Sequence, residues 1–124
     1  MESKEGGLFS HDPAIFYDEK SKYYYIYSTD TAPKFREGIG GQIRRSKDLV
    51  HFEYIGTALK EVPEEVKELT GVRNIWAPDI IKVGDEYRLY YSASTFGSQN
   101  SVIGLAVADN PQGPFIHRGI AVHT

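Results

Sequence analysis

One short pattern occurs twice in this chain, and a tandem repeat restricts the folds that the chain can adopt. The pentapeptide His11-Asp12-Pro13-Ala14-Ile15 opens the first copy, and Trp76-Ala77-Pro78-Asp79-Ile80 opens the second. Each pentapeptide is followed by a similar succession of apolar stretches and polar turns. The sequence therefore predicts two related structural units, each with a carboxylate near its start.

Each copy is expected to form four short strands. The apolar stretches are short, rich in Tyr, Ile and Val, and bounded by Gly, Pro, Asn and Asp, which favours strands over helices. Repeated four-stranded units with turns between them are typical of a β-propeller, in which each unit is one blade around a central channel. After the pentapeptides, the expected strands cover 23–28, 42–46 and 52–59 in the first copy and 87–92, 102–108 and 115–122 in the second.

The aromatic run Tyr23–Ser28 is aligned with Tyr87–Ser92 in the repeat. Alternation along a strand would put Tyr23, Tyr25 and Tyr27 on one face of the sheet. Sugar-binding clefts use such side chains, but so do propeller cores, and we favour the core for this run.

A helical insertion is expected between the two units. Residues 60–69 contain Pro63 followed by acidic residues, and both features are typical of the first turn of a helix. We therefore divide the chain into a first blade at 8–59, a helical insertion at 60–72 with the helix near 62–69, and a second blade at 73–124.

The chain is short for the fold that its repeat predicts. Propellers have about four to eight blades, and 124 residues accommodate two. Because repeat units need several neighbours to bury a continuous core, the chain is expected to be part of a longer protein or to complete itself by self-association.

Composition excludes several classes of function. The net charge of −3 provides no basic surface for nucleic acid, and no cysteine is present to form a disulfide or to act as a nucleophile. No apolar run is long enough to cross a membrane, and no leader is visible at the N-terminus. The expected location is secreted or periplasmic if a leader was removed, and cytoplasmic otherwise.

The four histidines do not lie at the spacings of metal ligands. His51 and His117 occupy matching places in the two copies, close to Phe52 and Phe115. This match favours a role in blade packing for both histidines.

Four segments carry a resemblance to a known family: His11–Ile15, Ser46–Leu49, Trp76–Ile80 and Tyr90–Ser98. In this order they resemble the first two blades of glycoside hydrolase family 43. The stretch Ser94–Ser98, with Ser101–Ala106 after it, is similar to the endo-α-1,5-L-arabinanases of that family. The resemblance runs from about Leu8 to the end of the chain. It implies a five-bladed β-propeller that hydrolyses arabinan with inversion at the anomeric carbon.

Inverting hydrolysis needs a carboxylate that activates water and a carboxylic acid that protonates the leaving oxygen, roughly 6.5 to 9.5 Å apart. The resemblance places the base at Asp12, for which a turn-forming Asp-Pro pair is the alternative. In the second copy Ala77 stands at the same position, so the fold does not need an acid there. The family's second aspartate and its glutamate acid have no counterpart in these residues. The chain is therefore expected to be inactive by itself.

The other expected sugar contacts lie in the second copy. The resemblance puts Trp76 and Phe96 in the sugar cleft, where an indole can cover the apolar face of a furanose. Phe96 lies in a polar loop, which makes a core role less expected. Asn100 and Ser101 are expected either to donate hydrogen bonds to sugar hydroxyls or to form a turn. Asp79 is expected either to make a structural hydrogen bond or to contact the substrate.

Two alternatives stand beside an arabinanase fragment. The chain is either a non-catalytic sugar-binding or self-assembling half-propeller, or a part of a β-xylosidase or α-arabinofuranosidase of the same family. The expected ligand is arabinan or an arabino-oligosaccharide. No cofactor is required by the residues present, and the resemblance adds a calcium ion only for the complete propeller.

Overall fold

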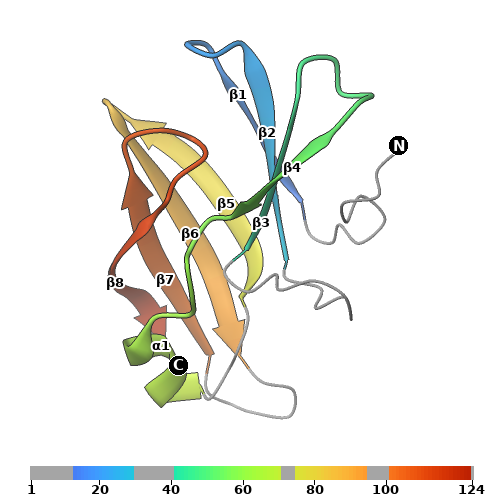
Figure 1. Cartoon of the computed structure of the whole chain (residues 1–124). Coiled ribbons are helices and arrows are strands. Elements are labelled where there is room, and N and C mark those ends of the chain that lie inside the picture. The colour runs from blue at the N-terminus through green and yellow to red at the C-terminus, as the bar shows by residue number, and fades with distance from the viewer. Residues whose placement is uncertain (1–12, 30–40, 71–74, 95–100, 124) are drawn as a thin grey trace.

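The computed structural model describes residues 13–29, 41–70, 75–94 and 101–123. They form two four-stranded antiparallel sheets, with strand orders β1-β2-β3-β4 and β5-β6-β7-β8, and one short helix between the sheets in the chain (Figure 1). The prediction of an all-β chain with two four-stranded units and an intervening helix is confirmed. The elements are β1 (Ala14–Asp18), β2 (Tyr23–Ser28), β3 (Gln42–Ser46), β4 (Glu53–Thr57), α1 (Glu64–Thr70), β5 (Trp76–Val83), β6 (Glu86–Ser94), β7 (Ser101–Ala108) and β8 (Ile116–His123).

The two sheets begin with hairpins of different length. In the first sheet, Asp18 pairs with Tyr23 across a four-residue turn. In the second sheet, Val83 pairs with Glu86 across a two-residue turn. The first turn is therefore two residues longer than the second, whereas the alignment of the two aromatic runs allowed for one extra residue.

The alignment of the aromatic runs is wrong by one residue as a result. Ile15, in the first pentapeptide, pairs with Ile26. Its counterpart Ile80 pairs with Leu89, so Leu89 is the structural equivalent of Ile26 and not of Tyr25. Since successive residues of a strand point to opposite faces of the sheet, this offset decides which face each side chain occupies.

One face of the first sheet, called here its front face, is turned toward the second sheet. It carries Phe16, Tyr25, Tyr27 and Ile43, which belong to or pack against the core. The ring of Tyr27 meets that of Phe115 edge to face, with centroids 6.3 Å apart. Tyr25 and Tyr27 are both buried, so the prediction that this aromatic run belongs to the core is confirmed.

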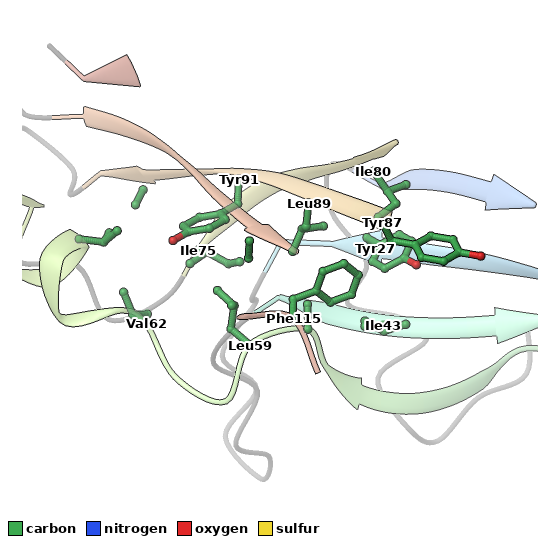
Figure 2. Packing of buried hydrophobic residues seen from close by; sticks show 14 of the residues in the cluster. Tyr27, Ile43, Leu59, Val62, Ile75, Ile80, Tyr87, Leu89, Tyr91 and Phe115 are labelled. Carbon is green, nitrogen blue, oxygen red and sulfur yellow. The ribbon is translucent and has the colours of Figure 1, made fainter. Parts of the chain in front are cut away.

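The second sheet packs against this front face with one of its own faces, called here its rear face. Residues of the connection between the sheets, Leu59, Val62 and Ile75, lie in the same cluster (Figure 2). The amide of Phe115 also donates a hydrogen bond to the carbonyl of Ala58 at 2.8 Å. The apolar faces of the two sheets are therefore buried against each other and against the connection between them. The rear face of the second sheet consists of Ile80, Tyr87, Leu89, Tyr91 and Ala106.

Helix α1 lies against β6 and β7 of the second sheet (Figure 1). Its first turn carries Glu64 and Glu65, where the helix dipole favours negative charge. The carbonyl of Pro63, just before the helix, accepts hydrogen bonds from the amides of Val66 and Lys67. Val66 is fully buried, so the helix is held by its apolar side. No helix in the described part of the chain is long and apolar enough to cross a membrane.

The two histidines that were expected to match do not share a role. The side chain of His51 is 79% exposed and pairs with Asp48 in the turn that follows β3. His117 lies at the strand position that Tyr54 occupies in the first sheet, and its ring contacts Glu65 of α1 at 2.7 Å. The packing role predicted for His51 is therefore wrong, whereas His117 joins β8 to the helix.

Candidate functional site

A β-bulge in β5 brings two of the candidate residues onto one face of the second sheet. Trp76 lies opposite Ser92, and Asp79 lies opposite Tyr90. Two residues of β5, Ala77 and Pro78, therefore lie opposite the single residue Tyr91 of β6. Ala77, within the bulge, has a positive φ of 44°. Residues three apart on a regular strand face opposite sides. The extra residue puts Trp76 and Asp79 on the same side.

The bulge is held against the first sheet by a hydrogen bond. The amide of Ala77 donates to Thr29 Oγ1 at 2.9 Å. Thr29 directly follows β2, so the end of β2 fixes the position at which β5 begins. Nothing in the sequence pattern pointed to this contact, because the two residues come from different repeats.

A hollow with a volume of about 360 Å³ lies on the second sheet beside Trp76. Its wall combines the indole of Trp76 and the apolar side chains of Ile103 and Val122 with the hydroxyl groups of Ser94 and Ser101. Binding sites for small molecules are concave and largely apolar, with a few polar groups that orient the ligand. An aromatic ring beside hydroxyl groups also suits a sugar, which has an apolar face and a polar rim.

Ser94 and Ser101 form a polar edge of this hollow. They are partners in the β6–β7 ladder, and Ser101 Oγ donates a hydrogen bond to Ser94 Oγ at 3.1 Å. The structure thus brings together Trp76 and Ser101, two of the expected sugar contacts. The sequence reasoning missed Ser92 and Ser94, which also line the hollow. Alternation along β6 places these two serines on one face and could have indicated them.

Asp79 lies on the same side of the sheet as Trp76 but not in the wall of the hollow. Its side chain is exposed, and Asp79 Oδ1 accepts a hydrogen bond from the amide of Ile80 at 2.9 Å. The structural hydrogen bond that was one of its two expected roles is therefore present. The exposed carboxylate is also accessible to a ligand.

Three expected site residues, Asp12, Phe96 and Asn100, lie outside the described residues. Their roles stay predictions from the sequence. Within the described ranges, no group of three or more His, Cys, Asp or Glu side chains is placed to hold a metal ion. Of the expected site residues, the described ranges therefore contain Trp76, Asp79 and Ser101.

A buried carboxylate joins the two sheets near the start of β6, at the opposite end of this strand from the hollow. Asp18, at the end of β1, is 2% exposed, and its Oδ1 accepts a hydrogen bond from the Tyr87 hydroxyl at 2.7 Å. Burial alone would raise the pKa of Asp18, but hydrogen bonds from Tyr87 and Ser21 outweigh burial and hold this pKa below its ordinary value. Burial, together with the neighbouring Asp18, raises the pKa of Tyr87 to about 12. The pair therefore consists of a carboxylate and a neutral phenol at neutral pH.

The fold defines the class of protein first. Two four-stranded antiparallel sheets, one from each sequence repeat and packed around a common core, are two blades of a β-propeller. Sequence comparison then gives the family: residues 7–124 match the profile of glycosyl hydrolases family 43, and the chain belongs to this family. The resemblance read from the two pentapeptides and the segments around them is confirmed.

Relatives with high similarity are arabinan-degrading enzymes by name. An extracellular endo-α-(1→5)-L-arabinanase of Thermotoga petrophila is 38% identical over 124 residues, covering 90% of this chain and 24% of the relative. Arabinan endo-1,5-α-L-arabinosidase C of Emericella nidulans is 37% identical over 110 residues, covering 86% of this chain and 31% of the relative. The chain thus spans about a quarter to a third of the length of these relatives.

Solved structures agree with the fold. A Bacillus subtilis arabinanase has a TM-score of 0.80 at 25% identity, covering 93% of this chain and 38% of that chain. A Cellvibrio cellulosa α-L-arabinanase complexed with arabinohexaose has a TM-score of 0.76 at 31% identity, covering 93% of this chain and 36% of that chain.

Proposed function

We propose that this chain supplies the general base and part of the sugar cleft of an inverting glycoside hydrolase that acts on α-1,5-linked arabinan. The hollow lined by Trp76, Ser94 and Ser101 carries the proposal, because it presents an apolar ring and hydroxyl groups together. The names of the arabinanase relatives, and the related structure in complex with arabinohexaose, support arabinan as the substrate. The extracellular Thermotoga petrophila relative supports a secreted enzyme.

In the proposed mechanism, Asp12 removes a proton from the attacking water. The water adds to the anomeric carbon on the face opposite the leaving group, while a carboxylic acid protonates the leaving oxygen. No acidic residue of the described ranges lines the hollow at Trp76. We propose that the acid and the second aspartate lie outside these 124 residues, as would the ligands of any calcium ion in the complete propeller. The chain alone then does not hydrolyse arabinan.

The single tryptophan of the chain makes sugar binding directly measurable. Trp76 is the only Trp in the sequence, so tryptophan fluorescence reports on the hollow alone. Titration with arabinohexaose is expected to change the emission, and titration with xylohexaose is expected to leave it unchanged. An equal response to the two sugars would instead favour a xylan-directed or unselective site.

A variant pair separates stacking on the indole from general effects on folding. Trp76→Ala is expected to weaken arabinohexaose binding about tenfold or more, measured by calorimetry, because the sugar loses its aromatic platform. Tyr17→Ala removes an exposed aromatic side chain of the first sheet and is expected to leave the affinity unchanged. Equal affinities for the two variants would exclude Trp76 as a sugar contact.

The catalytic half of the proposal is tested by the release of reducing ends from linear arabinan. The purified chain is expected to show no turnover above the buffer blank. Turnover that disappears in Asp12→Asn would keep Asp12 as the base and show that the acid is present within the chain.

A non-catalytic sugar-binding module is the second candidate. The lining of the hollow favours it, since the described wall contains binding groups and no carboxylate. Selective arabinohexaose binding by the chain, with no change in the activity of a longer form of the protein on Asp12→Asn, would support this candidate.

A further inference from the structure

The bulge in β5 offers a single backbone N–H group for hydrogen bonding. Its two residues are Ala77 and Pro78, and a proline has no N–H group. The amide of Ala77 donates to Thr29 Oγ1 at 2.9 Å. The hydroxyl oxygen of a residue that follows β2 of the first sheet therefore accepts the one N–H group of a bulge in the second sheet.

The backbone of this bulge has a conformation that needs support from its surroundings. Ala77 has a φ of 44°, and an L-residue in the left-handed region is strained because its Cβ approaches the following carbonyl oxygen. Such a conformation persists only where the surrounding structure fixes it. Ala77 is exposed, so packing of its side chain contributes little. The hydrogen bond to Thr29 supplies the support.

The conformation of the bulge decides where the side chain of Trp76 lies. Trp76 directly precedes the bulge and is opposite Ser92 of β6. Without the extra residue, the alternation of side chains along β5 would put Trp76 and Asp79 on opposite faces of the sheet. The indole shares the wall of the hollow with Ser92 and Ser101. The hollow therefore keeps this wall only while the bulge is kept.

Thr29 is well placed to fix the start of β5. Strand β5 contacts both β1 and β2 of the first sheet, and Thr29 directly follows β2 and is half-buried. The end of β2 is itself held by pairing, since Tyr27 lies opposite Ala14 of β1 and Ser28 lies opposite Gln42 of β3. The first sheet therefore provides a fixed support for the hydroxyl group that holds the bulge.

We propose that Thr29 is a positioning residue for the sugar site. Its hydroxyl group holds the β5 bulge in the conformation that places the indole of Trp76 in the wall of the hollow, and Thr29 is not among the described residues that line this wall. The inference rests on the proposed function, because it takes the hollow to be the sugar site. Loss of the hydroxyl group lowers the fraction of molecules with the binding-competent bulge, and the apparent affinity for sugar decreases in proportion.

Calorimetric titration of the full chain with arabinohexaose tests the proposal. Thr29→Val removes the hydroxyl group at nearly constant size and is expected to weaken binding about two- to tenfold, whereas Thr29→Ser keeps the hydroxyl group and is expected to bind like the wild type. Thr57→Val is the matched control, because it removes a hydrogen bond from the Thr57 hydroxyl to the Leu59 carbonyl at 2.7 Å, outside the hollow. Equal affinities of Thr29→Val and the wild type would overturn the proposal.

Emission of Trp76 in the absence of sugar separates this proposal from the proposed function. Thr29→Val is expected to shift the emission maximum and to make the indole more accessible to acrylamide, whereas Thr29→Ser and Thr57→Val are expected to change neither. Unchanged emission in a Thr29→Val variant that circular dichroism shows to be folded would contradict the positioning role. Changed emission in Thr29→Val, together with equal arabinohexaose affinities of the wild type and Trp76→Ala, would support the positioning role and contradict the proposed function.

A variant of Ala77 tests whether Thr29 acts through the bulge. Glycine adopts a positive φ without the steric strain of alanine, so the bulge of Ala77→Gly depends less on Thr29. Thr29→Val is therefore expected to weaken arabinohexaose binding less in the Ala77→Gly background than in the wild type. An equal decrease in affinity in the two backgrounds would show that Thr29 does not act through the bulge. Thr29→Ala, which adds no methyl group, provides the same comparison if Thr29→Val does not fold.

Discussion

At the scale of single residues, Gly104 shows how tightly the second sheet packs around a tyrosine ring. A Cβ atom on Gly104 would lie 2.5 Å from Tyr91 Cζ, whereas one on Gly119 would meet nothing within 4 Å. We expect Gly104→Ala to lower the free energy of unfolding by about 1 to 3 kcal/mol, because the buried ring must move. Urea unfolding checks this, with Gly119→Ala as the control. An equal decrease in the free energy of unfolding in the two variants would show that contact with the Tyr91 ring does not cause the destabilisation.

The hydrogen bond between Asp18 and Tyr87 is the second feature at this scale. Tyr87→Phe is expected to cost about 2 kcal/mol of stability at neutral pH, because the buried carboxylate loses a donor. Tyr24→Phe is the matched control, since its hydroxyl group makes no hydrogen bond to the described residues and its ring remains half-buried. A Tyr87→Phe variant as stable as Tyr24→Phe would contradict the assignment.

The same pair predicts how stability depends on pH. The pKa of Asp18 is lowered in the folded chain from its ordinary value of 3.8, so the unfolded chain binds this proton more tightly. The carboxylate therefore stabilises the fold above that ordinary pKa, and the contribution is lost as the pH falls through the lowered pKa of the folded chain. Tyr87→Phe removes a hydrogen bond that lowers this pKa. The free energy of unfolding should therefore decrease less at acidic pH in this variant than in the wild type. Urea unfolding at a series of acidic pH values measures the free energy of unfolding of both proteins. An equal decrease with falling pH in the two proteins would contradict the prediction.

At the scale of elements, helix α1 depends on packing more than on its own propensity. It has seven residues, and helices this short are marginal in water without tertiary contacts. Val66→Ala, at a fully buried position, is expected to cost about 2 kcal/mol. Leu69→Ala, at a 42% exposed position of the same helix, is expected to cost much less. Thermal unfolding compares the two, and a larger effect at Leu69 would reverse the assignment of the buried side.

Strands were easier to predict than their register. Short Tyr-, Ile- and Val-rich runs between turn residues indicated all eight strands, because local propensity and alternation act over a few residues. The equivalence of Tyr24 with Tyr87 was missed, because it depends on two turns of different length. Similar composition reveals that a repeat is present, but it does not give the number of residues in each turn.

At the scale of the whole molecule, the two sheets are expected to unfold together. Their core includes Tyr27 and Ile43 from the first sheet, Leu89 and Tyr91 from the second, and Leu59 between them. Unfolding one sheet would expose the apolar face of the other, so a single cooperative transition is expected. Emission of Trp76, which reports on β5, and far-ultraviolet circular dichroism of both sheets should have the same midpoint in urea. Two separate midpoints would show that the blades are independent.

The candidate site could be predicted only in part from the sequence. Trp76 and Ser101 were identified from motifs, and the structure brings them to one hollow. Ser94 was missed, because its role follows from its pairing with Ser101 across β6 and β7. The place of Asp79 on the side of Trp76 follows from the bulge at Ala77, which a strict alternation of faces would not predict.

The sequence by itself determined the number of units, the type and order of their strands, and the family motifs, because these depend on residue type and on short spacings. Only the tertiary structure decided which faces meet, which residues share the hollow at Trp76, and which surfaces stay exposed. Those outcomes depend on turn lengths, on the bulge in β5 and on contacts such as Ala77 with Thr29. A change of one residue in register moves every side chain of a strand to the opposite face, so pairing between strands, rather than composition, decides where each functional group lies.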